Sequence, residues 1–184
     1  MNLTEKQINS KEIYNGKVLK LRLDDIELPD GSPAKREVIR HSGAVCIAPL
    51  TDDGNLVFVK QFRYAVGMEL LELPAGRIDP NESPLVTGER ELKEETGFVA
   101  ENTKYIGRLF PTPGYSDEVI WLFACKVSSE KGNTNFDEGE IVDTVVIPLD
   151  KAYEMVINDE IFDSKTQILI LRLKAAIDKG TLSL

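Results

Sequence analysis

Hydrophobic and polar residues alternate in several short runs along the chain, and turn-forming residues separate these runs. Residues 17–27 and 36–41 have strand-like patterns on either side of a Leu-Pro-Asp-Gly-Ser turn, which predicts a small antiparallel sheet at the start. Residues 44–50 and 56–63 are apolar and flank a turn at 52–55, which predicts a hairpin. Further strands are expected at 105–109, 119–126 and 144–148.

One helix is expected between these strands, and two more at the end of the chain. Ser83 and Pro84 fit an N-cap followed by proline at the first helical position, and Gly97 fits the left-handed residue after a helix, so the first helix is predicted over 84–96. The two terminal helices are predicted at 151–158 and about 164–179. Strands with one embedded helix and two closing helices favour a mixed α/β sandwich, of the α+β type, over a doubly wound parallel sheet.

Composition limits the classes of partner. The chain has 184 residues, 42% of them hydrophobic, enough for one sizeable core. Its net charge of -9 disfavours nucleic-acid and anionic-membrane partners, and no apolar run reaches the length of a membrane span. The first residues lack the pattern of a signal peptide, so a cytoplasmic location is expected. Cys46 and Cys125 lie in apolar runs without a metal-binding spacing, which predicts reduced core thiols.

The predicted helix at 84–96 is unusually acidic. Glu91, Glu94 and Glu95 are spaced i, i+3 and i+4, which places the three carboxylates on one helical face. Each like-charge pair at this spacing costs a few tenths of a kcal/mol in an isolated helix. A hard divalent cation would remove the repulsion, whereas the plain alternative is a solvated helix face.

The residues around this helix resemble the Nudix hydrolase family. The Nudix box reads Gly-x5-Glu-x7-Arg-Glu-apolar-x-Glu-Glu-x-Gly-apolar, and nine residues of this chain fall at its positions: Gly76, Glu82, Arg90, Glu91, Leu92, Glu94, Glu95, Gly97 and Phe98. The resemblance implies a Nudix-type α/β/α sandwich with a mixed sheet over residues 44–184. A small antiparallel β-sheet over residues 1–43 would precede it and serve as a dimerisation element.

The same resemblance implies a metal site and a reaction. Glu91 and Glu95 look like the main ligands of Mg²⁺ or Mn²⁺, both of which prefer oxygen ligands. Glu94 would join them or orient a bound water, and the backbone carbonyl of Ala75 would complete the site. Arg90 would brace the helix by pairing with a box carboxylate such as Glu94. Nudix proteins typically hydrolyse a nucleoside diphosphate linked to a further group.

A segment downstream of the box narrows the substrate. Pro113 lies sixteen positions beyond Gly97, a spacing that resembles the ADP-ribose pyrophosphatase subgroup. This likeness implies hydrolysis of ADP-ribose to AMP and ribose 5-phosphate, with Glu118 in contact with substrate and Tyr115 lining the pocket, although both could equally be packing in a rigid loop. The alternatives are a pyrophosphatase for another nucleotide sugar, such as GDP-mannose, and a sensor that binds ADP-ribose without cleaving it.

The catalytic base and the anion-binding groups are less sharply defined by sequence. The acidic segment 137–143 resembles the loop that supplies a catalytic glutamate in these enzymes, and Glu140 is the preferred candidate, with Glu138 as its competitor. Arg63 looks like the family arginine that grips the diphosphate, since a guanidinium suits bidentate contacts. Arg77 is a weaker candidate for the same role, as is Arg36 or Arg40.

The leading sheet commonly serves the homodimer in the ADP-ribose subgroup, and a homodimer is therefore expected here. In that subgroup it also lends residues to the partner's substrate site. Tyr14 and Tyr64 are both candidates for the aromatic residue that stacks on adenine, and the sequence does not choose between them. His41, the only histidine, is predicted to be a strand-edge residue without a catalytic role.

Overall fold

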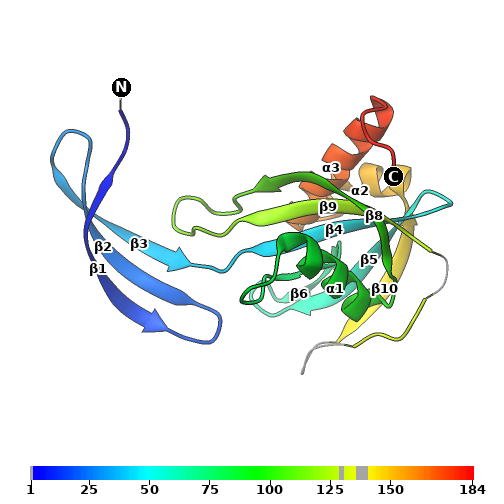
Figure 1. The fold of residues 1–184 in the computed structure, drawn as a ribbon, viewed down its shortest axis with the longest axis horizontal. Coiled ribbons are helices and arrows are strands. Elements are labelled where there is room, and N and C mark those ends of the chain that lie inside the picture. The colour runs from blue at the N-terminus through cyan, green and yellow to red at the C-terminus, as the bar shows by residue number, and fades with distance from the viewer. Residues whose placement is uncertain (1, 129–130, 136–140) are drawn as a thin grey trace. The chain divides into compact units, whose positions relative to one another are not determined.

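Two compact units make up the chain in the computed structural model, which describes residues 2–128, 131–135 and 141–184. The first unit contains residues Met1–Ser42 together with Phe110–Val119, and the second contains Gly43–Leu109 with Ile120–Leu184. Figure 1 shows both units, coloured from blue at the N-terminus to red at the C-terminus. The segment 110–119 therefore packs with the N-terminal residues, although it lies far from them in sequence.

The first unit is built on a three-stranded antiparallel sheet with the order β1-β2-β3. Its strands are β1 (Lys6–Asn15), β2 (Lys20–Glu27) and β3 (Pro33–Arg40). Strands β2 and β3 overlap the predicted runs at 17–27 and 36–41. Strand β1 was not predicted, because it is mostly polar and nine of its ten residues are exposed, so it carries little alternation.

The second unit holds a seven-stranded mixed sheet with the order β10-β5-β4-β9-β8, in which β6 also pairs with β5 and β7 with β4. Strands β4 and β9 are parallel, and the other pairs are antiparallel. The mixed sheet confirms the predicted α+β class. The strands are β4 (Ala44–Thr51), β5 (Asn55–Arg63), β6 (Met68–Glu72), β7 (Ala75–Arg77), β8 (Ala100–Leu109), β9 (Ile120–Val127) and β10 (Val142–Pro148).

The hairpin predicted from residues 44–50 and 56–63 forms only next to its turn. The register of β4 with β5 is limited to Leu50 opposite Leu56. Beyond this point β7 pairs with β4 from Ala44 to Cys46, and β6 pairs with β5 from Val59 to Arg63. The two strands of the predicted hairpin are thus adjacent and antiparallel, and two short later strands pair with β4 and β5 away from the turn.

Three helices occur in the described residues: α1 (Pro84–Thr96), α2 (Leu149–Ile157) and α3 (Ser164–Asp178). The bounds predicted for α1 are confirmed, and the Ser83 side chain accepts a hydrogen bond from the backbone N–H of Val86. Gly97 ends the helix with φ 77°, and a Cβ at this position would overlap the carbonyl oxygen of Gly132. None of the described helices has the length and apolar character needed to cross a membrane.

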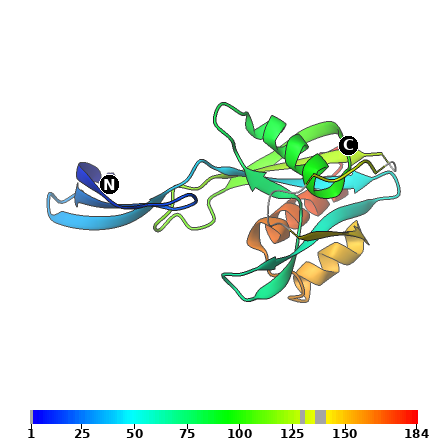
Figure 2. The same ribbon diagram turned by 90° about the horizontal axis from the view of Figure 1, so that it is seen from below.

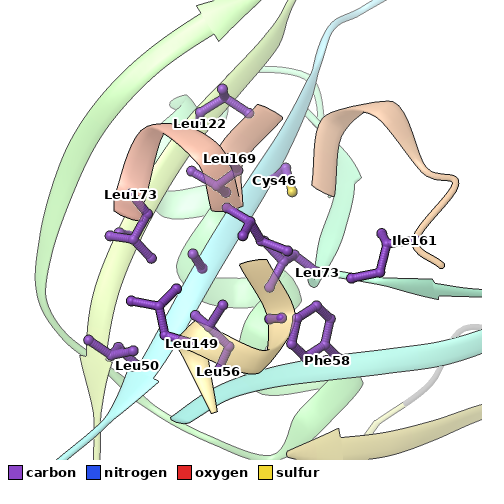
Figure 3. Close-up of a cluster of buried hydrophobic side chains, with 14 of the residues drawn as sticks. Cys46, Leu50, Leu56, Phe58, Leu73, Leu122, Leu149, Ile161, Leu169 and Leu173 are labelled. Atoms are coloured by element: carbon purple, nitrogen blue, oxygen red, sulfur yellow. The ribbon is translucent and has the colours of Figure 1, made fainter. Parts of the chain in front are cut away.

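Apolar clusters cover both faces of the large sheet. Helix α1 packs on one face through a cluster that includes Leu92 and Phe98, and helices α2 and α3 pack on the opposite face, as Figure 2 shows. Figure 3 shows the cluster under α2 and α3, where Cys46 lies among leucines. Cys46 and Cys125 are buried free thiols, as predicted, and burial raises the pKa of Cys125 to about 12.

Candidate active site at helix α1 and strand β7

The backbone of β7 and the side chains of α1 meet at one point of the second unit. The Glu91 carboxyl group fills the space beside Gly76, where a Cβ would overlap it. The backbone N–H of Ala75 donates to Oε2 of Glu95 over 3.2 Å. Glycine at position 76 is thus required by close approach, and two carboxylates one helical turn apart lie against two consecutive residues of β7.

This meeting point fits a hard divalent cation. The Glu95 side chain is buried and that of Glu91 is mostly so, which strengthens any charge interaction there. Mg²⁺ is usually held by one or two carboxylates and keeps several waters, so Glu91, Glu95 and the main chain at Ala75 offer a suitable donor set. Over residues 2–128, 131–135 and 141–184, no group of three or more Asp, Glu, His or Cys side chains is arranged to hold a metal by itself.

Arg90 binds the carboxylates on the neighbouring side of the helix. Its Nε and Nη2 donate to the two oxygens of Glu82 over 3.1 and 3.0 Å, and its Nη1 lies 2.8 Å from Glu94 and 2.9 Å from Glu91. The hydrogen bond with Arg90 is the main reason that the pKa of Glu82 is lowered. Arg90 thus pairs with Glu94 as expected, and because Glu82 precedes the helix, its contacts with Arg90 also join the loop to the helix.

Glu94 faces a different environment from Glu91 and Glu95. It lines a hollow of about 570 Å³ on the outer side of α1, together with Val86, Glu89, Arg90, Lys93, Val99, Ala100, Asn133 and Asn135. Its carbonyl oxygen accepts a hydrogen bond from the backbone N–H of Asn135 over 2.9 Å. The structure therefore brings Glu91, Glu95 and Ala75 together, and Glu94 shares Nη1 of Arg90 with Glu91.

Arg63, at the end of β5, belongs to a charged cluster that the sequence analysis missed. It forms a two-pronged ion pair with Glu72, whose side chain is only 1% exposed. Glu72 also binds Nζ of Lys165, on α3, over 2.5 Å. Burial alone would raise the pKa of Glu72, but hydrogen bonds and charges from Arg63 and Lys165 outweigh it and lower that pKa. The available signal was a single charge inside the apolar run Leu70-Leu71-Glu72-Leu73.

Arg77 follows Gly76 directly and lies at the end of β7, opposite Ala44. Its side chain is exposed, and its carbonyl oxygen accepts a 3.5 Å hydrogen bond from Nη2 of Arg90. The backbone of Arg77 therefore lies beside the site of Glu91 and Glu95, because it follows Gly76 and contacts Arg90.

The segment that contains Pro113 and Glu118 is fixed to strand β3 within the first unit. The backbone N–H of Ile39 donates to the Tyr115 carbonyl over 2.7 Å, and that of Asp117 donates back to Ile39 over 3.2 Å. Asp117 accepts from the backbone N–H of His41 over 2.8 Å and pairs with Arg40. The Nδ1 of His41 lies 3.7 Å from Glu118. The histidine thus lies just beyond the end of β3.

The remaining candidates have simpler surroundings. Arg36 pairs with Glu5 on the exposed sheet, and Tyr64 is 92% exposed in the turn after β5. Tyr14 lies on β1 and is also exposed. Glu138 and Glu140, the candidate bases, lie outside the described residues. These surroundings do not choose between the two tyrosines.

Known protein families, relatives and a solved structure resemble this chain over most of its length. The sequence model of the NUDIX domain matches residues 39–169, and that of the nucleoside diphosphate sugar hydrolase N-terminal domain matches residues 5–39. The chain is 40% identical over 176 residues to a methanol dehydrogenase activator of Bacillus methanolicus, covering 94% of this chain and 95% of the relative. It is 38% identical over 179 residues to an ADP-ribose pyrophosphatase of Bacillus subtilis, covering 96% and 97%. A crystal structure of an ADP compounds hydrolase shares the fold, with a TM-score of 0.86 at 21% identity over 99% and 100% of the two chains.

The close approach at Gly76 generates a test of the site. The Gly76→Ala substitution should force the Glu91 carboxyl group away from β7 and weaken Mn²⁺ binding by about 10- to 100-fold. Isothermal titration calorimetry measures this affinity. Gly114→Ala is the matched control, because a Cβ there meets nothing within 4 Å. Equal Mn²⁺ affinity in the two variants would contradict the placement of the metal beside Glu91.

Proposed function

The chain belongs to the Nudix hydrolase family, and from this premise we propose that it hydrolyses the diphosphate linkage of ADP-ribose, and of other ADP-sugars, to release AMP and a sugar phosphate. With ADP-ribose the second product is ribose 5-phosphate. The observation that carries the proposal is the pair Glu91 and Glu95 against β7, inside a fully matched Nudix box. The identity of 38% to an ADP-ribose pyrophosphatase over nearly the whole chain supports the choice of substrate.

The proposed cofactor is Mg²⁺, with Mn²⁺ as an alternative. The carboxylates of Glu91 and Glu95 and the carbonyl of Ala75 would hold it, and Glu94 would join them or orient a water. When bound, a divalent ion screens the charge of the diphosphate and activates water. Glu94 would have to exchange its contact with Arg90 for this role, since Nη1 of Arg90 is 2.8 Å from its carboxylate.

The diphosphate would be bound by arginines. Arg63 and Arg77 are the proposed contacts, because a guanidinium offers several donors to phosphate oxygens. Glu118 and Pro113 are the proposed substrate contacts of the segment that is fixed to β3. The tight anchoring of that segment through Ile39 and Asp117 supports a defined position for Glu118.

Glu140 is the proposed catalytic base. Its carboxylate would accept a proton from the attacking water or orient it, which requires hydrogen-bond reach to that water. Glu138 is the nearest competitor for this role. The chemistry of the site supports the need for such a group, because Glu91 and Glu95 would already be engaged as ligands.

The proposed assembly is a homodimer formed through the first unit. Strand β1 exposes Ile8, Ile13 and Tyr14, and Ile8 and Ile13 lie at the two irregularities in the register between β1 and β2. A three-stranded sheet with this much exposed apolar surface is stabilised by a second covering layer. A second copy of the chain is the proposed cover.

The proposed small-molecule partner is a nucleotide sugar. No nucleic-acid or membrane partner is proposed, in line with the net charge of -9.

The proposed location is the cytoplasm. It is supported by the two buried free thiols, Cys46 and Cys125, which suit a reducing compartment.

The reaction can be tested with a substrate panel. The purified protein with Mg²⁺ should release AMP and ribose 5-phosphate from ADP-ribose, and turn over ADP-glucose, GDP-mannose, NADH and nucleoside triphosphates more slowly. Chromatography of the products measures this. Glu95→Gln should lower Mg²⁺-dependent kcat/KM by at least about tenfold, since it removes a ligand charge. Preferred turnover of GDP-mannose would establish the rival pyrophosphatase, whereas tight binding without turnover would establish the sensor.

The base can be tested by comparing two matched variants. Glu140→Gln should lower kcat by about 10²- to 10⁴-fold, the usual contribution of a general base, while Glu138→Gln should stay within about threefold of the parent. Single-turnover kinetics at saturating Mg²⁺ measures the chemical step. The reverse pattern would move the role to Glu138, and full activity in both variants would eliminate a glutamate base from this segment.

Assembly can be tested by mass in solution. Sedimentation velocity should give twice the chain mass of 20.5 kDa, and Ile8→Glu with Ile13→Glu should give the single mass, because two buried charges would disfavour the apolar contact. Lys11→Gln, on the same exposed strand, is the control and should leave the dimer intact. A monomeric parent protein would refute the proposed assembly.

A further inference from the structure

A buried charged cluster links β5, β6 and α3 in the second unit. At its centre lies Glu72, on β6, whose side chain is 1% exposed. Arg63 reaches it from β5, and Lys165 reaches it from the first turn of α3. Lys165 also pairs with Asp163 over 3.0 Å, and its side chain is 12% exposed. Two cations and two carboxylates thus lie together in this part of the second unit.

The pairing of Arg63 with Glu72 uses one edge of the guanidinium. Nε donates to Oε1 over 2.6 Å, and Nη2 donates to Oε2 over 2.7 Å. Nη1 makes no hydrogen bond with any part of the chain that the structure describes. The Arg63 side chain is 43% exposed, in contrast to its partner. The guanidinium is therefore held on its buried edge and keeps the Nη1 donors for a group outside the cluster.

Lys165 and Asp163 add a second ion pair to this contact. A lone carboxylate in bidentate contact would largely cancel the positive charge of Arg63. Here Oε2 of Glu72 is shared with Nζ of Lys165, 2.5 Å away, so the carboxylate is balanced by two cations. Asp163 balances Lys165 in turn, and its side chain also caps α3 by accepting from the backbone N–H of Thr166. Because Asp163 offsets the charge of Lys165, these four side chains carry no net charge, and the contribution of Lys165 is to hold the Glu72 carboxylate in place against Arg63.

Stability alone does not account for such a cluster. Taking charges out of water is costly, and a buried ion pair often stabilises a fold no better than apolar residues of similar volume. Fixing an arginine in advance, however, reduces the ordering cost when it binds an anion. The bidentate contact also fixes the plane of the guanidinium, whereas a lysine at position 63 would have no planar group to fix.

We propose that Glu72 and Lys165 are positioning residues for Arg63, which they hold with its Nη1 edge directed to the diphosphate of the substrate. This inference rests on the proposed function, in which Arg63 binds that diphosphate. Neither Glu72 nor Lys165 touches the substrate in this arrangement. Their effect on binding passes through Arg63, so removing Arg63 should abolish it.

A double-mutant cycle tests this coupling. Glu72→Gln should raise KM for ADP-ribose by about 10- to 100-fold, the range of a charge-assisted hydrogen bond, with kcat within about threefold of the parent. In an Arg63→Gln background, the same substitution should change KM by less than about twofold, because its route to the substrate is already lost. Steady-state kinetics of the four proteins, each well below its unfolding temperature, gives the coupling.

Two further variants keep the test decisive. Glu69→Gln makes the same change on β6 at an exposed carboxylate paired with Lys60, and should leave KM unchanged. Lys165→Met removes the second cation, and should raise KM in the parent background but not beside Arg63→Gln. This variant replaces Glu72→Gln if the latter does not fold.

The outcomes separate this inference from the function on which it rests. An unchanged KM in Glu72→Gln, or effects of Glu72→Gln and Arg63→Gln that multiply, would overturn the positioning role while leaving the hydrolase intact. A parent protein without activity on ADP-ribose would instead refute the proposed function. A lower unfolding temperature with an unchanged KM would show that the cluster only stabilises the fold.

Discussion

Repulsion among the carboxylates of α1 is the constraint on which the arrangement of this site depends. The helix offsets it in two ways that act on different sides. Arg90 gathers Glu82, Glu91 and Glu94 around one guanidinium, and the backbone N–H of Ala75 donates to Glu95. The first contact fixes the loop before the helix, and the second fixes β7 beside it. A helix that would be unfavourable alone is thus held by the parts of the chain that it must meet.

The two apolar faces of the sheet give this helix its position. Leu92 and Phe98 bury α1 against one face, and the larger cluster under α2 and α3 fills the other. The sheet therefore acts as a rigid middle layer. Two carboxylates, Glu95 and Glu72, are also buried in this unit. Glu95 accepts a hydrogen bond from the backbone of β7, and Glu72 pairs with side chains from β5 and α3. These polar contacts therefore connect the sheet to the helices packed on it.

Local signals in the sequence were sufficient to predict the bounds of α1, whereas the pairing of distant segments could not be predicted from the sequence. Ser83 and Gly97 marked both ends of the helix because capping depends on a few neighbouring residues. The divided pairing of β4 depends on which distant strand takes each hydrogen bond, and no local pattern encodes that choice. Strand β1 was missed for another reason, because its mostly polar and exposed residues show little alternation. The carboxylates of the Nudix box could likewise be identified from their spacing in the sequence. Lys165, 93 residues beyond Glu72, could be joined to it only by the fold.

The first unit is discontinuous along the chain, since residues 110–119 complete it by pairing with β3 through Ile39. Three chain crossings therefore connect the two units, and neither unit corresponds to one uninterrupted gene segment. If recombination replaced only the N-terminal 42 residues, Tyr115 and Asp117 would face a β3 strand of unrelated sequence. Successful exchange of this sheet between relatives would need both segments to move together. The fold thus ties the inheritance of the sheet to that of the segment holding Pro113 and Glu118.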